Sequence, residues 1–269
     1  MAIKQFCLVV VRHGQATHNL ETFNRADLVM TDEPVMPFMN SPLTTEGRQQ
    51  AGMVARRLQD TKFDLGLASD LVRAWDTAQA IVQLNPSLQG VEECRLLRER
   101  NAGVLDGDKV VGMSQWAVEE AIEDRELLTW RIPEGESVVD LRNRAREFLE
   151  LVQSKALALE AEHPTILVAT HYVWMHEFYR ILAEQCPALG ASVGKKPRTP
   201  NTGVDQYTLT TEAGQGGQPH LRNIAMDVIS CGKHLEDGSG YSGLPSEGAE
   251  RVGGERAVAA RAGARGPGA

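Results

Sequence analysis

The chain has 269 residues, of which 42% are hydrophobic and 5% aromatic, so it is long enough for one large domain or two small ones. Its formal net charge of −8 argues against nucleic acid or an anionic membrane as a main partner, because both attract basic surfaces. No apolar stretch approaches a membrane span, and no basic segment with an apolar signal core begins the sequence. We therefore expect a soluble, cytoplasmic protein with no membrane partner.

Short apolar runs alternate along the chain with segments of helical periodicity. The expected strands are 6–11, 63–68, 91–97 (the weakest), 165–169, 204–210 and 221–230. The expected helices are 44–59, 69–84, 114–129, 138–161 and 173–184, with Ser137 and Asp140 as an N-cap pair for the fourth. This alternation predicts an α/β fold of three layers, α/β/α, with a mostly parallel sheet.

Two segments depart from this alternation. Residues 20–43 contain three prolines with apolar residues between them, which predicts an irregular loop folded over something. Residues 236–269 are rich in Gly, Ala, Arg and Glu and hold almost no large apolar side chains. Such a tail cannot bury enough surface to offset its ordering entropy, so we predict that it is disordered. Residues 1–235 are then expected to form a single domain.

The first strand ends in Arg12 and His13, the most informative pair in the sequence. The carboxyl ends of strands are where ligands bind in open α/β sheets. An arginine offers a fixed cation with a planar fork suited to phosphate, and a neutral histidine is a nitrogen nucleophile near physiological pH. Together they predict chemistry on a phosphoryl group of a small substrate, with His13 attacking.

Other polar groups follow the later strands. Asn19 comes shortly after the first strand, and Arg73 falls in the first turn of the helix after the second. Glu99 follows the third expected strand, and His171 follows the strand at 165–169. Because a parallel sheet gathers such groups at one edge, we expect them to lie close to His13.

Five short motifs mark these places: VRHGQ at 11–15, SDLVRAWDTA at 69–78, LRE at 97–99, GES at 135–137, and the late strand that ends in His171. In this order they resemble the motifs of the histidine phosphatase superfamily, which groups phosphoglycerate-mutase-like and fructose-2,6-bisphosphatase-like enzymes. The resemblance covers about residues 5–230 and implies a phosphoglycerate-mutase-like fold. Within the family, the layout looks like that of the TIGAR-like fructose-2,6-bisphosphatases.

The resemblance also implies the chemistry of the reacting groups. His13 resembles the nucleophile that becomes phosphohistidine, and Glu99 resembles the acid that protonates the leaving oxygen. The ionised Glu99 would then take a proton from the incoming water. No metal or other cofactor is implied, and the sequence offers no cluster with metal-ligand spacing.

The remaining motif residues are implied to bind the phosphoryl oxygens. Arg12, Arg73 and His171 resemble the clamp, with His171 acting as a protonated donor. Asn19 resembles a further hydrogen-bond donor. Preorganised donors of this kind suit the charge that spreads over the equatorial oxygens in a loose phosphoryl transition state.

Three positions depart from the family pattern. Ala16 stands where a hydroxyl is usual, so either a supporting hydrogen bond is lost or Thr17 replaces it. Ala102 replaces a frequent aromatic residue, and Tyr172 replaces the usual glycine after the late histidine. These changes bear on the fit of the substrate more than on phosphoryl chemistry. They also leave open a catalytically degenerate phosphate-binding or scaffold protein on the same fold.

Hydrolysis is the interpretation that the sequence favours over a mutase reaction. Phosphoglycerate mutases resemble one another in an Arg-Arg pair and a proline run between the acid motif and the GES motif. Residues 104–134 contain no Arg-Arg pair and only Pro133. The sequence therefore predicts a metal-independent phosphomonoester hydrolase, on a sugar bisphosphate if the TIGAR-like resemblance extends to substrate. A phosphoglycerate-type mutase is the alternative enzyme.

Overall fold

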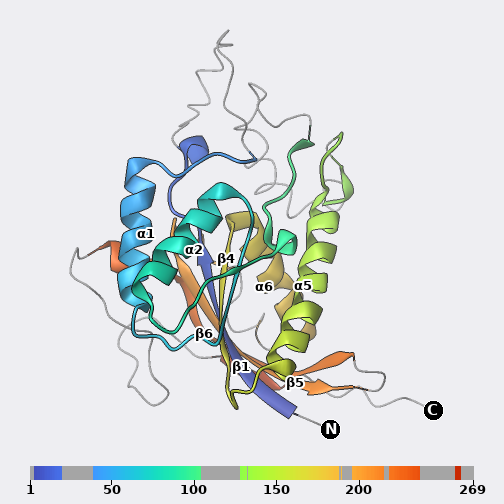
Figure 1. Cartoon of the computed structure of the whole chain (residues 1–269). Coiled ribbons are helices and arrows are strands. Elements are labelled where there is room, and N and C mark those ends of the chain that lie inside the picture. Colours follow the sequence, from blue (N-terminus) through green and yellow to red (C-terminus); the bar gives the residue numbers. More distant parts are fainter. Residues whose placement is uncertain are drawn as a thin grey trace.

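The computed structural model describes residues 3–19, 39–103, 128–131, 133–187, 189, 196–214, 218–236 and 258–261. Most of the expected loop at 20–43, of the expected helix at 114–129 and of the expected tail at 236–269 lies outside these described residues. The described part forms one twisted sheet with helices on both of its faces (Figure 1).

The sheet is mixed, in the order β3-β2-β4-β1-β5-β6-β7. Its strands are β1 (Ile3–Arg12), β2 (Leu65–Ala68), β3 (Glu92–Glu93), β4 (Thr165–Thr170), β5 (Val204–Ala213), β6 (Pro219–Cys231) and β7 (Val258–Arg261). The pairings from β3 through β2 and β4 to β1 are parallel, and β5, β6 and β7 continue the sheet with antiparallel pairings. The parallel half holds the strands whose ends carry the motif residues.

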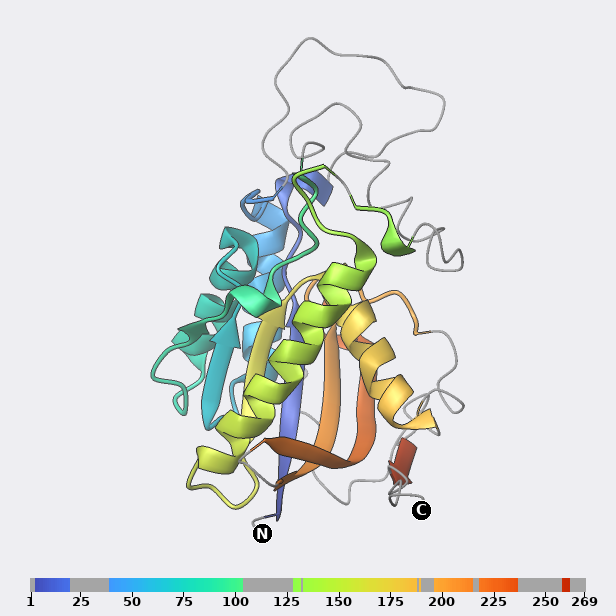
Figure 2. The same ribbon diagram turned by 90° about the vertical axis from the view of Figure 1, so that its right-hand side faces the viewer.

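Helices form the two outer layers, as the sequence predicts (Figures 1 and 2). The helices are α1 (Thr45–Leu58), α2 (Val72–Leu84), α5 (Val138–Ala158) and α6 (Tyr172–Gln185). Side chains of β1 alternate between two apolar cores: Val9 and Val11 pack in the core with α1 and α2, and Leu8 and Val10 in the core with α5 and α6. Because β1 is buried on both faces, its sequence is a continuous apolar run. The phosphoglycerate-mutase-like α/β/α architecture is confirmed.

Two elements begin or end at places the sequence does not indicate. The predicted helix at 69–84 begins only at Val72. The backbone N–H of Ser69 still donates to the carbonyl of Ala169 in β4, so the chain continues the strand pairing at that residue. A side chain distant in sequence then caps the helix, since Asn40 Oδ1 accepts from the N–H of Val72 at 2.9 Å. The predicted strand at 91–97 shortens to two residues and becomes a 3-10 helix at Arg95–Leu97. The predicted cap of α5 is confirmed, as Ser137 and Asp140 form a reciprocal capping box.

The loop after β1 packs against the start of α1 so closely that both contact positions must be glycine. A Cβ on Gly14 would lie 2.4 Å from the carbonyl oxygen of Gly47, and a Cβ on Gly47 would lie 1.9 Å from that of Gln15. Both contacts are with backbone, which cannot turn away as a flexible side chain can. The glycines therefore set the distance between the helix and the residues that follow β1.

We predict that Gly47→Ala destabilises the protein, because the new Cβ must displace the loop that begins at His13. Gly52→Ala on the same helix is the matched control. Its Cβ would meet only the end of the Arg56 side chain, at 3.9 Å. Removing glycine there should stabilise by about 0.5–1 kcal/mol. Urea unfolding of both variants measures the difference, and equal unfolding free energies would contradict the packing argument.

A buried histidine, His234, contacts both α1 and Thr202, which lies just before β5. His234 lies in η5 (Lys233–Leu235), is 4% exposed, and contacts Arg57 of α1. The hydroxyl of Thr202 donates to the carbonyl of Asn201 and is 2.9 Å from His234 Nε2. Nε2 must therefore carry the hydrogen, while Nδ1 accepts from the Arg57 guanidinium at 3.2 Å. Burial, then the charge of Arg57, lowers the pKa of His234 to about 4.

The neutral form of His234 makes the stability of the domain depend on pH. In the unfolded chain its pKa returns to about 6.5, so the unfolded state takes up a proton first as the pH falls. The stabilisation is complete above pH 6.5 and is lost between about 6.5 and 4, by up to about 1.4 kcal/mol per pH unit. We predict that His234→Gln, which cannot titrate, loses less stability over this range. Urea unfolding from pH 7.5 to 4.5 measures this, and parallel curves for the two proteins would contradict it.

Candidate active site

The two motif histidines lie side by side at the carboxyl ends of β1 and β4. The N–H of His13 donates to the carbonyl of Thr170 at 2.9 Å, which carries the β1–β4 pairing one residue past the strand. The ring centroids of His13 and His171 are consequently 5.2 Å apart. His13 is 2% exposed and His171 is fully buried, so both imidazoles face an interior that bulk water does not fill.

One ring nitrogen of His13 is committed to the backbone. Nδ1 lies 2.6 Å from the carbonyl oxygen of Gly14. A carbonyl can only accept, so Nδ1 carries the hydrogen and Nε2 keeps the lone pair. The main chain is fixed as well, because the carbonyl of His13 accepts from the N–H of Thr202 at 3.1 Å and from Asn201 Nδ2 at 3.2 Å. The arrangement fixes the ring and leaves the lone pair on Nε2, as the predicted nucleophile requires.

The charge state of His13 also suits a nucleophile. Burial holds its pKa well below the ordinary value of 6.5, and the charges of Arg73, His171, Arg12 and His18 lower it further. The imidazole is therefore neutral at physiological pH, when its lone pair is available.

Two buried arginines flank the histidines and are oriented by backbone carbonyls. Arg12 Nη1 donates to Thr199 at 2.7 Å, and Arg73 Nη1 donates to Met39 at 2.7 Å. The Arg12 guanidinium also lies over the ring of Tyr172, 5.1 Å from its centroid. Tyr172, one of the departures from the family pattern, thus shapes the site at Arg12. Backbone carbonyl oxygens, and for Arg12 an aromatic face, orient these cations beside the two histidines, where positive charge favours an anion.

His171 differs from its predicted charge state. Its Nε2 lies 2.9 Å from Ser69 Oγ, and its buried Nδ1 has no hydrogen-bond partner among the described residues. Burial lowers its pKa well below 6.5, and the charge of Arg73 adds to the effect. His171 is therefore neutral at physiological pH, whereas the sequence predicts a protonated donor. An anion bound beside it would favour the charged form, so the proton is gained with the ligand rather than in advance.

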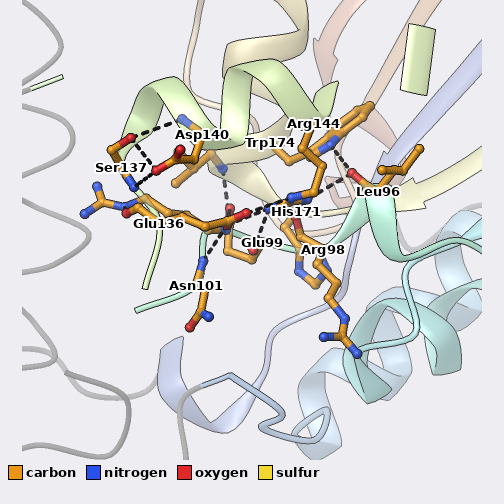
Figure 3. Close-up of polar contacts among 12 residues, drawn as sticks. Leu96, Arg98, Glu99, Asn101, Glu136, Ser137, Asp140, Arg144, His171 and Trp174 are labelled. Atoms are coloured by element: carbon orange, nitrogen blue, oxygen red, sulfur yellow. Dashed lines mark hydrogen bonds and ion pairs between the residues drawn. The ribbon is translucent and has the colours of Figure 1, made fainter. Parts of the chain in front are cut away.

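Glu99 lies beside His171, held at the start of α6 (Figure 3). Its Oε2 accepts from the N–H of Val173 at 3.1 Å, two residues after His171, and its Oε1 accepts from the N–H of Arg100 at 2.9 Å. The side chain is partly buried. The structure thus brings the predicted acid to the same edge of the sheet as the predicted nucleophile.

Asn19 braces the loop after β1. Its Oδ1 accepts from the N–H of Ala16 at 2.9 Å and from Asn201 Nδ2 at 3.3 Å. The hydroxyl of Thr17 has no hydrogen-bond partner in the described part of the chain, so it does not replace the hydroxyl missing at Ala16. Ala16 is instead fully buried in a bridge to Leu43. The oxygen of Asn19 supports the loop, and the role of Asn19 as a donor to the phosphoryl group stays a prediction.

Two functional candidates are missed by sequence reasoning. His18 has its ring centroid 5.7 Å from that of His13 and its Nδ1 2.5 Å from Ser41 Oγ; burial, Arg73 and Arg12 lower its pKa to about 2. Arg144 of α5 holds the backbone around Glu99. A signal for Arg144 exists: it lies between Leu141 and Phe148 on the buried side of α5, where an unpaired charge would be costly.

The described residues contain no group of three or more His, Cys, Asp or Glu side chains that could hold a metal ion. The four cysteines are present as free thiols. No helix in the described ranges combines the length and the apolar character needed to cross a membrane.

Comparison with known proteins agrees with this geometry. The model of the histidine phosphatase superfamily (branch 1) matches residues 8–215. Fructose-2,6-bisphosphatase TIGAR of Xenopus tropicalis is 24% identical over 279 residues, which cover 87% of this chain and 96% of that protein. A 2,3-bisphosphoglycerate-dependent phosphoglycerate mutase of Gloeobacter violaceus is 32% identical over 168 residues, 61% of this chain and 69% of the mutase.

A solved phosphoglycerate mutase from Bacillus anthracis shares the fold, with a TM-score of 0.61, 18% identity, and coverage of 87% of this chain and 97% of that one. The match to the family model spans the motifs at 11–15, 69–78, 97–99, 135–137 and 171. The chain therefore belongs to branch 1 of the histidine phosphatase superfamily, and its enzyme class is that of a phosphoric monoester hydrolase.

Proposed function

We propose that the protein hydrolyses a small phosphomonoester through a phosphohistidine formed on His13, without a metal ion. The observation that carries the proposal is the state of His13: a buried, neutral imidazole whose Nδ1 is bonded to a carbonyl and whose Nε2 holds the lone pair. Arg12 and Arg73 supply fixed positive charge beside it. This is the combination that attack on a phosphoryl group needs.

In the first half-reaction, Nε2 of His13 forms a bond to phosphorus while the bond between phosphorus and the leaving oxygen breaks. The protonated carboxyl of Glu99 gives its proton to that oxygen, so the product leaves as an alcohol. Arg12, Arg73 and the imidazole of His171 bind the phosphoryl oxygens, where negative charge gathers.

In the second half-reaction, a water oxygen forms the new bond to phosphorus and the bond to Nε2 breaks. The Glu99 carboxylate takes a proton from that water, which restores the acid. Inorganic phosphate leaves, and His13 returns to its neutral form.

The sugar bisphosphate is the substrate class that we propose for this reaction. A relative that matches 87% of this chain is a fructose-2,6-bisphosphatase by name. The clamp and the acid recognise the phosphoryl group and the leaving oxygen, which every phosphomonoester shares. The Arg12 guanidinium lies over the ring of Tyr172. Tyr172 is a residue of this site that departs from the family pattern.

The hydrolase proposal predicts turnover of p-nitrophenyl phosphate in the presence of EDTA. His13→Ala should lose this activity by roughly 10³-fold or more, because the site holds no substitute for the nucleophile. His163→Ala is the matched control, since the His163 side chain is 66% exposed. The rate of nitrophenol release measures the activity of the wild-type protein and of both variants. Substantial activity in His13→Ala would contradict the mechanism, and an inactive wild-type protein that still binds phosphate would support the degenerate scaffold.

The alternative mutase is tested by its product. With 3-phosphoglycerate and a trace of 2,3-bisphosphoglycerate, we predict slow release of inorganic phosphate and no 2-phosphoglycerate. The reason is that residues 104–134 lack the Arg-Arg pair with which mutases resemble one another. Phosphorus NMR of the mixture distinguishes the products, and accumulation of 2-phosphoglycerate would establish the mutase reaction instead.

A further inference from the structure

The backbone that carries Glu99 is held by one guanidinium group, that of Arg144 in α5 (Figure 3). Arg144 Nη1 donates to the carbonyls of Leu96 and Arg98 at 2.9 and 2.7 Å. Arg144 Nη2 donates to the carbonyl of Glu99 itself at 3.2 Å. Three carbonyls within four residues thus converge on a single side chain, which is 16% exposed.

Glu136 completes this support. Arg144 Nε and Nη2 donate to the two oxygens of the Glu136 carboxylate at 2.9 and 2.7 Å, as a bidentate pair. Glu136 Oε2 also accepts from the N–H of Asn101 at 2.9 Å, and the Glu136 carbonyl accepts from Arg100 Nε at 3.0 Å. The pair therefore grips the chain on both sides of Glu99.

The segment needs such support because Glu99 itself lies outside the helices and strands, although α6 holds the residues before it: Trp174 Nε1 donates to the carbonyl of Leu96 at 2.7 Å. The 3-10 helix ends at Leu97, two residues before Glu99. The Glu99 carboxylate contacts its own neighbour Arg100 and the start of α6 at Val173. An ion pair of Arg98 with Asp70 adds an anchor on the solvent side, where the Arg98 side chain is 40% exposed. That pair is bidentate and holds Arg98 alone, whereas Arg144 and Glu136 hold the backbone on both sides of Glu99.

We propose that Arg144 is a positioning residue for the proton transfer: together with Glu136 it holds the Glu99 carboxyl where the leaving oxygen arises. This inference rests on the proposed function of Glu99 as the acid. Five directed N–H groups of the guanidinium serve three carbonyls and one carboxylate, which a lysine ammonium cannot do in the same geometry. A displacement of about 1 Å at a reacting group can cost roughly 10²-fold in rate.

The test uses the basicity of the leaving group to distinguish a positioning role of Arg144 from a general structural role. An acid matters when the leaving oxygen is basic, and it matters little when the alcohol leaves readily as an anion. The value of kcat/KM reports steps up to formation of the phosphoenzyme, so it isolates the half-reaction in which Glu99 donates. We compare phenyl phosphate, which has a poor leaving group, with p-nitrophenyl phosphate, which has a good one.

We expect Arg144→Lys to lower kcat/KM for phenyl phosphate by roughly 10- to 100-fold and that for p-nitrophenyl phosphate by less than about 3-fold. Glu99→Gln should show the same selectivity more strongly. Adding Arg144→Lys to Glu99→Gln should then lower kcat/KM little further, because both changes remove one function. Arg146→Lys is the matched control: Arg146 lies one half-turn along α5, is 41% exposed, and pairs with Glu184 at 2.9 Å. It should leave both substrates unaffected.

Two results would contradict different claims. If Glu99→Gln is selective for the poor leaving group but Arg144→Lys slows both substrates equally, the positioning role is wrong and Arg144 is merely structural. If Glu99→Gln itself slows both equally, the proposed acid is wrong. Should Arg144→Lys fail to fold, Glu136→Gln removes the charge of its bidentate partner and must show the same selectivity, or the inference falls.

Discussion

The parallel pairing of β1 with β4 brings together residues that are more than 150 positions apart, and the site is built around this contact. The ladder runs from Cys7 opposite Thr165 to Arg12 opposite Thr170, and the N–H of His13 extends it by one bond. A slip of one residue would turn the apolar side chains of β1 to the wrong cores, so the register is fixed by burial on both faces of the sheet. The same register sets His13 beside His171.

The positive charges of this site are arranged to bind an anionic ligand. The guanidinium groups of Arg12 and Arg73 donate to the carbonyls of Thr199 and Met39, which orient them beside the two histidines. Burial, followed by the charges of the arginines, keeps the neighbouring imidazoles neutral. A dianionic phosphoryl group would reverse the local field and favour protonation of His171. The electrostatics thus suit a nucleophile before binding and a clamp after it.

Sequence reasoning succeeded where the information is local. Continuous apolar runs predicted β1 and β4, and the residues after them, His13 and His171, are at the predicted edge. It was less accurate for α2, whose first N–H is capped by Asn40 from a distant segment, and for β3, where the chain leaves the sheet early. The charge of His171 depends on Arg73, a residue on another element, and no local pattern indicates that.

The contacts that hold the backbone around Glu99 show most clearly that local sequence patterns do not predict contacts between distant segments. Glu136 belongs to the GES motif but receives no role from the sequence, and its partner Arg144 lies beside the apolar stripe of α5. Their contacts with Leu96, Arg98 and Asn101 span about 35–48 positions in the sequence. Local reasoning finds the reacting groups at strand ends and can mark Arg144 as a buried charge, whereas the contacts that fix the reacting groups are found only once the elements are packed.

The central claim is that Nε2 of His13 attacks phosphorus, since Nδ1 is bonded to the carbonyl of Gly14. The two phosphohistidine isomers differ in which ring nitrogen carries phosphorus, and phosphorus NMR distinguishes them. The most direct measurement is therefore the spectrum of the phosphoenzyme, trapped during turnover of p-nitrophenyl phosphate and unfolded in alkali, in which phosphohistidine survives. The Nε2 isomer, absent from His13→Ala, is the predicted result; the Nδ1 isomer, or no phosphohistidine at all during turnover, would contradict the account.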